Sequence, residues 1–175
     1  MHPKLIIHGG FFSESQTNQE VKKAKQDALS EIVLRSAEYL KEHSALETVV
    51  YAVSLLEDCD LFNAGLGSQI QSDGKIRLSA SLMDGVSKKF SGVINIEDVK
   101  NPIQIAEKLL QYDDSVLSGE GALDFARKNK FAYFNPQTEQ RRQEYHQKLN
   151  GSRQGTVGCV AVRGSSASTA STCCR

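Results

Sequence analysis

Apolar residues recur at helical spacing in the first third of the chain. Thr17 and Glu20 form a capping-box pattern, and the apolar stripe behind them continues to Leu40. Ser44 and Glu47 repeat that pattern before a second stripe. Two amphipathic helices are therefore predicted here. Their apolar faces consist of Val21, Ala24, Ala28, Ile32 and Val33 in the first helix and Val49, Val50, Val53 and Leu56 in the second.

The spacing of apolar residues also predicts strands before and after these helices. Lys4–His8 has the pattern of a short buried strand, which the glycine pair at 9–10 ends. Residues 76–82 alternate between apolar and polar positions, and residues 90–96 are expected to be the next strand of a hairpin or meander. A third helix is predicted to begin at Asn101-Pro102, and a shorter one to cover residues 120–128.

The last 40 or so residues change composition twice. Residues 135–154 are almost entirely polar, which favours an exposed, mobile linker with at most transient helix. Residues 156–162 are apolar or small at every position, as in a strand buried on both faces. Residues 164–175 are mostly Ser, Thr and Ala without periodicity, and are interpreted as a flexible tail.

Composition and charge exclude several classes of function. Hydrophobic residues make up 39% and charged residues 24% of the 175, as in an ordinary globular domain. Lys+Arg and Asp+Glu both number 21, so the balance favours neither a nucleic-acid nor a membrane partner. The apolar run near the start is too short for a signal peptide, which makes the cytoplasm the expected location. The four cysteines are expected to be reduced, and their spacing does not fit a zinc site.

The junction between the polar linker and the strand that follows is the candidate for chemistry. A threonine hydroxyl needs a base to become a good nucleophile. If the peptide bond between Gly155 and Thr156 is cut, the new α-amine, with a pKa near ~8, provides that base on the same residue. Gly155 places no side chain in the way of attack on its carbonyl. The alternative is that Gly-Thr-Val-Gly simply opens an ordinary core strand.

Five short motifs in a fixed order decide between these interpretations. They are His8-Gly9-Gly10, Phe62-Asn63-Ala64-Gly65-Leu66-Gly67-Ser68, Ala80-Ser81-Leu82-Met83-Asp84-Gly85, Asn101-Pro102 and Gly155-Thr156-Val157-Gly158. Together they resemble the plant-type L-asparaginase / isoaspartyl peptidase family, over residues 4 to about 162. The resemblance implies an N-terminal-nucleophile hydrolase with a four-layer αββα sandwich, an α+β fold.

The resemblance also implies roles for individual residues. Thr156 is then the nucleophile freed by autoproteolysis, attacking an asparagine side-chain amide or a β-aspartyl peptide bond to give an acyl-enzyme. Asn63 matches the family's asparagine beside the nucleophile, and a left-handed turn is a compatible second role. Gly9 and Gly10 match a glycine turn near the nucleophile; an ordinary tight turn is the alternative for them.

The segment 56–66 resembles the family's sodium-binding stabilisation loop. The resemblance implies main-chain carbonyl ligands, which here belong to Leu56, Glu57, Cys59, Phe62, Ala64 and Leu66. Hard oxygen ligands suit an alkali cation, and main-chain carbonyls do not depend on side-chain identity. Such an ion holds the loop in place, and no cofactor is expected for the chemistry itself.

The sequence departs from the family's pattern in two places. Ser79 replaces the aspartate of a common Asp-Ala-Ser motif, and Arg163 stands where the family has an aspartate. The family's second active-site threonine falls on Cys174 without a gap or on Thr172 with a small one, and both alignments stay open. The family residues that hold the substrate's α-carboxylate and α-amine lie beyond these positions and have no counterpart here. We therefore expect an incomplete sandwich and a chain that is inactive or nearly so on its own.

These features give an expected organisation and a set of competing functions. Residues 1–134 form the large-subunit part, 135–155 the linker ending at the cleavage point, 156–163 the nucleophile strand and 164–175 an aberrant or flexible tail. The substrate is a small molecule, and the resemblance implies a dimer of processed heterodimers. One alternative is a non-catalytic partner of a complete homologue on the same scaffold. Another is a related enzyme such as glycosylasparaginase or a threonine-type endopeptidase, which the motifs fit less well.

Overall fold

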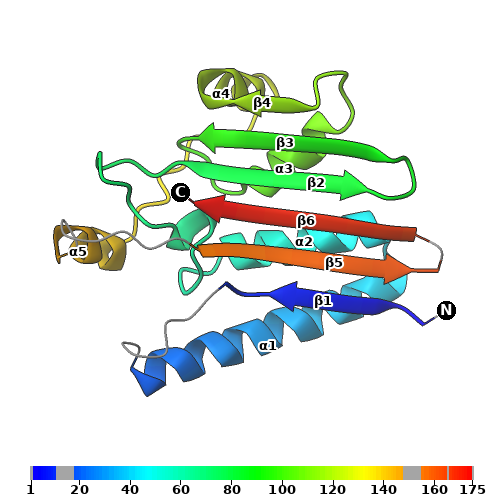
Figure 1. The fold of residues 1–175 in the computed structure, drawn as a ribbon, viewed down its shortest axis with the longest axis horizontal. Helices are drawn as coiled ribbons and strands as arrows, with labels where there is room; N and C mark the ends of the chain where they lie inside the picture. The colour runs from blue at the N-terminus through cyan, green and yellow to red at the C-terminus, as the bar shows by residue number, and fades with distance from the viewer. Residues whose placement is uncertain (1, 11–17, 148–154, 165, 175) are drawn as a thin grey trace.

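One six-stranded sheet forms the frame of the molecule in the computed structural model, which describes residues 2–10, 18–147, 155–164 and 166–174. The strands are β1 (Lys4–His8), β2 (Leu78–Asp84), β3 (Lys89–Ile96), β4 (Val116–Ser118), β5 (Gly155–Arg163) and β6 (Ser166–Cys174). Their order across the sheet is β1-β5-β6-β2-β3-β4, so the last strands of the chain lie in the middle (Figure 1). All neighbours are antiparallel except β3 and β4.

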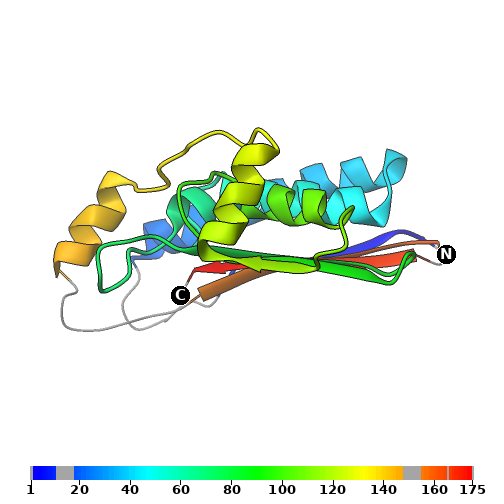
Figure 2. The ribbon, with the colours of Figure 1, turned by 90° about the horizontal axis from the view of Figure 1, so that it is seen from above.

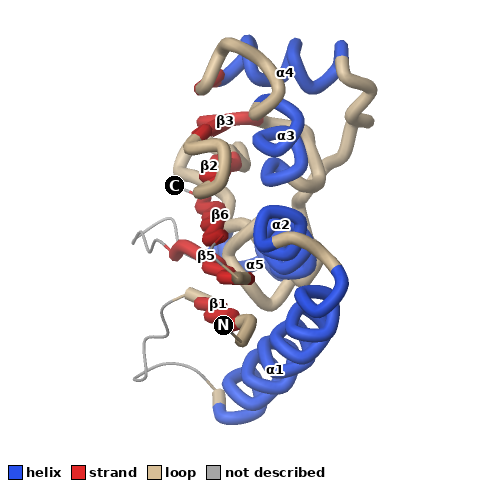
Figure 3. The backbone as a smooth tube through the Cα atoms, turned by 90° about the vertical axis from the view of Figure 1, so that its right-hand side faces the viewer, coloured by secondary structure: helices blue, strands red, loops and turns tan. Residues whose placement is uncertain are grey.

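Helices cover one face of this sheet. They are α1 (Gln19–Glu42), α2 (Ala45–Glu57), α3 (Pro102–Leu109) and α4 (Gly119–Lys128). Figures 2 and 3 show all four on the same side of the strands. A fifth helix, α5 (Glu139–Gln147), lies beyond one end of the sheet (Figure 1). Within the ranges given above, no helix has the length and apolar character that crossing a membrane requires.

The helix starts follow the sequence pattern closely, with one correction. Ser44 and Glu47 form the predicted capping box: the Glu47 carboxylate accepts from Ser44 N–H at 2.9 Å, and Glu47 N–H donates to Ser44 Oγ at 3.2 Å. The N-cap of α1 is Asn18 and not Thr17, which lies outside the described residues. The Asn18 side chain accepts from Glu20 N–H at 3.0 Å, since a short polar side chain at this position satisfies a free helix N–H.

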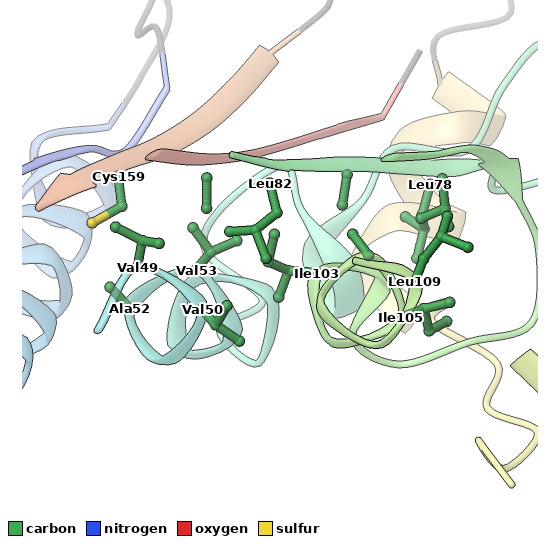
Figure 4. Close-up of a cluster of buried hydrophobic side chains, with 14 of the residues drawn as sticks. Val49, Val50, Ala52, Val53, Leu78, Leu82, Ile103, Ile105, Leu109 and Cys159 are labelled. Atoms are coloured by element: carbon green, nitrogen blue, oxygen red, sulfur yellow. The ribbon is translucent and has the colours of Figure 1, made fainter. Parts of the chain in front are cut away.

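The main core lies between the sheet and the helices α2 and α3. Valines of α2 (Val49, Val53) and apolar residues of α3 (Ile103, Leu109) point toward Leu78, Leu82 and Cys159 of the strands (Figure 4). These side chains are at most a few per cent exposed, and burying each large one stabilises the fold by about 1.5–3 kcal/mol. The predicted apolar face of the second helix and the alternation at 76–82 both supply this core.

The opposite face of the sheet is not covered by any described element (Figure 2). It leaves large apolar side chains open to solvent, among them Ile6 at 72% exposed and Phe90 at 49%. Val160 of β5 is 42% exposed, while Val157, Cys159 and Ala161 are buried under the helices. The prediction that β5 is buried on both faces is therefore wrong for the part of the chain that the structure describes, since only one layer of helices covers it; β1, predicted as a buried strand, is likewise covered on one face only.

Three further segments differ from the sequence-based expectation. The expected tail at 164–175 contains β6, which pairs with both β5 and β2. The expected linker at 135–155 contains α5, and its last residue, Gly155, is the first residue of β5. The short strand β4 was not predicted, because three residues are too few to display a period.

Candidate active site

The predicted cleavage point lies where β5 begins. β5 starts at Gly155, so the bond to Thr156 is the first peptide bond of a strand in the interior of the sheet. Backbone pairing places Thr156 opposite Cys173 of β6, while the side chains of these two residues lie outside the description. On the other flank β1 pairs as far as His8 with Gly158. The glycine pair that ends β1 therefore lies at the end of the sheet where β5 starts.

A small hydrophobic cluster joins the elements around this point. Its buried members are Ile32, Leu56, Phe62, Ala64 and Val157, and we call it the Phe62 cluster. Val157 directly follows Thr156, and Phe62 directly precedes Asn63. A side chain at Gly9 would meet Phe62 Cε1 at 3.0 Å, so this position has room only for glycine unless the ring moves. The structure thus brings together the segments of Thr156, Asn63 and Gly9.

The loop that carries Asn63 is held tightly. Asn63 Oδ1 accepts from the Gln69 N–H at 2.9 Å, across a one-turn 3-10 helix at Gly65–Gly67. Gly65 has a φ of +49°, a left-handed conformation that favours glycine, and a Cβ there would overlap the Glu57 carbonyl oxygen. A Cβ at Gly67 would overlap the Phe62 carbonyl oxygen. The glycines of this motif therefore allow a turn that no other residue fits.

The side chain of Glu57 is a buried acid that the sequence did not reveal. It is fully buried, and its Oε1 accepts from the Ile103 N–H at the start of α3 at 3.3 Å. Its Oε2 has no hydrogen-bond partner among the described residues. Burial raises the pKa of Glu57 well above its ordinary value, although the bond from the Ile103 N–H favours the charged form. The sequence pointed only to its main-chain carbonyl.

The side chain of Thr172, a residue of β6, lies on the helix-covered face of the sheet and is shielded from solvent. It is 1% exposed, pairs with Val157 across β5 and β6, and its hydroxyl donates to the Ser79 carbonyl at 3.0 Å. Its hydroxyl also interacts with Glu57 on the helix-covered face. Cys174, the other position considered for a second threonine, pairs through its backbone with Gly155. Backbone pairing therefore places Thr172 close to the start of β5, and its hydroxyl donates to a carbonyl of β2.

Arg163, which stands where the resemblance implies an aspartate, has a structural role in this chain. Its guanidinium donates to the carbonyls of Lys41 at 2.9 Å and His43 at 3.0 Å, where α1 ends. A cation is favourable at a helix C-terminus because free carbonyls and the helix dipole are negative there. An aspartate at this position would face the same carbonyls with the wrong charge.

Two further observations concern Cys159 as a possible nucleophile and the side chains that could bind a metal. Burial raises the pKa of the Cys159 thiol to about 12, which keeps it protonated at neutral pH. No group of three or more His, Cys, Asp or Glu side chains gathers as a metal site in the ranges that the structure describes. The main-chain carbonyl oxygens of Glu57 and Phe62 pack directly against Gly65 and Gly67, where Cβ atoms would overlap them.

Comparison with known sequences identifies the family of the chain. The sequence model of a family described as asparaginase matches residues 1–154, which include the Asn63 loop and the segment before Thr156. The chain belongs to the asparaginase family. Its isoaspartyl peptidase/L-asparaginase relative from Synechocystis sp. is 40% identical, over 93% of this chain and 54% of the relative.

Two other relatives have similar identities to the chain. A plant-type L-asparaginase from Pyrococcus abyssi is 38% identical over 82% of this chain and 47% of its own length. An isoaspartyl peptidase from Salmonella typhimurium is 38% identical over 75% of this chain and 44% of its own length. The chain spans about half the length of these curated relatives. Family membership and a mixed α+β fold, both predicted from the sequence, are confirmed.

Proposed function

We propose that this chain is the nucleophile-bearing part of an autoproteolytic amidohydrolase that acts on L-asparagine, on β-aspartyl dipeptides, or on both. The names of the relatives support this hydrolase class. The observation that carries the proposal is the position of the Gly155–Thr156 bond. It opens an interior strand, and the next residue, Val157, packs in the Phe62 cluster beside the Asn63 loop.

Self-cleavage follows from the chemistry of these two residues. The Thr156 hydroxyl oxygen attacks the Gly155 carbonyl carbon, the hydroxyl proton passes to the Thr156 nitrogen, and the C–N bond breaks to leave an ester. Water then hydrolyses the ester, which yields a carboxyl at Gly155 and a free hydroxyl and α-amine on Thr156. The side-chain amide of Asn63 is proposed to donate a hydrogen bond to the oxyanion that develops on the Gly155 carbonyl oxygen. The bond from the Gln69 N–H to Asn63 Oδ1 orients the amide for this role.

The same residue then turns over substrate. The Thr156 α-amine takes the hydroxyl proton while the oxygen attacks the side-chain carbonyl of asparagine. That proton leaves with ammonia, or with the amine of the next residue in a β-aspartyl dipeptide. Water hydrolyses the acyl-enzyme to release aspartate. Thr172 is proposed as the second threonine of the site, since its backbone pairs with that of Val157, the residue after Thr156; Glu57 is assigned to no step.

A second layer is proposed to complete the fold. The uncovered face carries exposed Ile6, Phe90 and Ile94, which a second sheet would bury to give the four-layer αββα sandwich. We propose that such a sheet also holds the groups that bind the substrate's α-carboxylate and α-amine, so that the 175 residues alone are inactive. Processed copies are further proposed to pair as a dimer of heterodimers.

A structural sodium ion is proposed for the loop at 56–66. The carbonyls of Leu56, Glu57, Cys59, Phe62, Ala64 and Leu66 would hold it, and the proposal is supported by the compact turn at Gly65 and Gly67, which leaves no room for side chains beside the Glu57 and Phe62 carbonyls. When bound, the ion holds the loop and with it Asn63.

Intact-mass measurement tests the nucleophile directly. Purified chain is incubated, and the expected result is two fragments with Thr156 as a new N-terminus. The Thr156→Ala variant is expected to stay whole, and cleavage of this variant at the same bond would refute the assignment.

Turnover tests the need for a second part. Ammonia release from asparagine is expected only after a complementary small subunit from a relative is added. Activity of the chain alone would refute the proposed inactivity.

The uncovered apolar face also favours one other function, a non-catalytic partner that binds a complete homologue. The two functions differ in one observable. A folded chain that never cleaves, even with the complementary subunit present, would favour the partner.

A further inference from the structure

Helix α5 lies just before the proposed cleavage point and has no apolar face of its own. Its nine residues, Glu139–Gln147, include no buried side chain. A helix this short is marginal in water, and one that is polar on all sides needs support from outside. Pairs within the helix, such as Arg142 with Glu139 at 3.9 Å, supply only tenths of a kcal/mol. Contacts with the rest of the fold must therefore hold α5.

Arg141 makes the strongest of these contacts. Its Nε donates to the Gly67 carbonyl at 2.7 Å, and its Nη1 pairs with Glu144 at 2.8 Å. The side chain is only 11% exposed, unlike that of the adjacent Arg142 at 59%. One turn later the Tyr145 hydroxyl donates to the Ser72 carbonyl at 3.1 Å. Both bonds join α5 to the segment 65–74.

A third element approaches the same place. Burial and the nearby charge of Arg141 lower the pKa of Lys25 on α1, while Glu144 acts in the opposite direction. Arg141 thus lies among α1, its own helix and the 3-10 turn. Its planar guanidinium can serve the carbonyl and the carboxylate together, which the single ammonium of a lysine does less well.

Arg141 is hydrogen-bonded to the loop that carries Asn63. Gly67 lies within the turn that the bond from Gln69 N–H to Asn63 Oδ1 closes. On the other side, β5 begins only eight residue steps after α5 ends, a span of at most about 29 Å. Fixing α5 therefore anchors one end of the chain that leads to Thr156, and the bond from Arg141 to the Gly67 carbonyl holds the turn that carries Asn63 in place.

We propose that Arg141 is a positioning residue for self-cleavage: by docking α5 on the turn that contains Gly67, it holds the Asn63 loop in place for the reaction at the Gly155–Thr156 bond. The inference rests on the proposed function for the reaction itself. It adds that a residue distant from Thr156 in the sequence controls the rate of that reaction without touching the reacting atoms.

The test compares two neighbouring arginines. Cleavage rates are measured by intact mass for the wild type, Arg141→Ala, Arg141→Lys and the control Arg142→Ala, and hydrogen exchange is followed over 139–147. Loss of a charge-assisted hydrogen bond predicts roughly tenfold slower cleavage and roughly tenfold faster exchange in Arg141→Ala. Arg141→Lys should fall between, and Arg142→Ala should stay within about twofold of the wild type, because its side chain is exposed.

Each outcome bears on a different claim. Unchanged exchange in Arg141→Ala would overturn the docking, and unchanged cleavage despite faster exchange would overturn the positioning role. A folded wild type that never cleaves, with or without the complementary subunit, would overturn the proposed function and the positioning role together. Circular dichroism of each variant checks that the sheet is intact, so that slow cleavage is not mistaken for unfolding.

Discussion

Replacing the buried acid Glu57 by glutamine is expected to stabilise the protein, and more so at higher pH. Burial raises the pKa of Glu57, so the folded state binds its proton more tightly than the unfolded state does. Its contribution to stability is then fully present below the unfolded pKa, near ~4.5, and is lost as the pH rises toward the raised folded pKa. Glu57→Gln has no such proton to lose.

The magnitude follows from one proton and one hydrogen bond. Between the unfolded and folded pKa values the wild type should lose up to roughly 1 kcal/mol per pH unit relative to Glu57→Gln. The glutamine carbonyl can still accept from the Ile103 N–H, which is 3.3 Å from Oε1 in the wild type. Glu57→Met cannot, and leaving that buried N–H unpaired should cost about 1–3 kcal/mol relative to Glu57→Gln.

Urea unfolding followed by circular dichroism at pH 5 to 9 measures both effects. The exposed acid Asp124 provides a matched control, since Asp124→Asn changes the same charge at the surface of α4. Parallel stability curves for the wild type and Glu57→Gln would refute the reasoning. So would a Glu57→Gln variant that is less stable than the wild type at pH 8.

Two more predictions concern the loop that carries Asn63. Gly67→Ala should destabilise the fold by about 1–3 kcal/mol or more, because the new Cβ overlaps the Phe62 carbonyl. The control Gly121→Ala, in α4 with no atom within 4 Å of its Cβ, should stabilise it by about 0.5–1 kcal/mol; equal effects in thermal unfolding would contradict the steric argument. Replacing sodium by choline at constant ionic strength should lower the melting temperature if the loop binds the ion, and an unchanged value would argue against the sodium site.

Local signals predicted a large share of the fold correctly. The Ser44–Glu47 capping box and the alternation at 76–82 both depend on neighbours within a few residues; the structure has the capping box as expected and the strand two residues later, at 78–84. The five motifs identified the family, since short glycine and asparagine patterns reflect backbone geometry that few sequences share. The role of Thr156 stays a prediction, because its side chain is outside the described residues.

The sequence alone misjudged the segments whose structure depends on distant partners. β6 is built from Ser, Thr and Ala, so its alternation carries no hydrophobic contrast, yet backbone bonds to β5 and β2 make it an interior strand. The linker appeared to be unstructured because no apolar stripe supports it, while Arg141 and Tyr145 tie it to carbonyls some 70 residues away.

The chain by itself determined its local caps, its hairpin and its family, since these depend on residues close in sequence. Only the tertiary structure decided that Glu57 is a buried acid, that Thr172 faces the helices and that one face of the sheet stays open. Burial, desolvation and hydrogen bonding depend on which segments pack together in the fold, and local patterns along the sequence do not reveal these tertiary contacts.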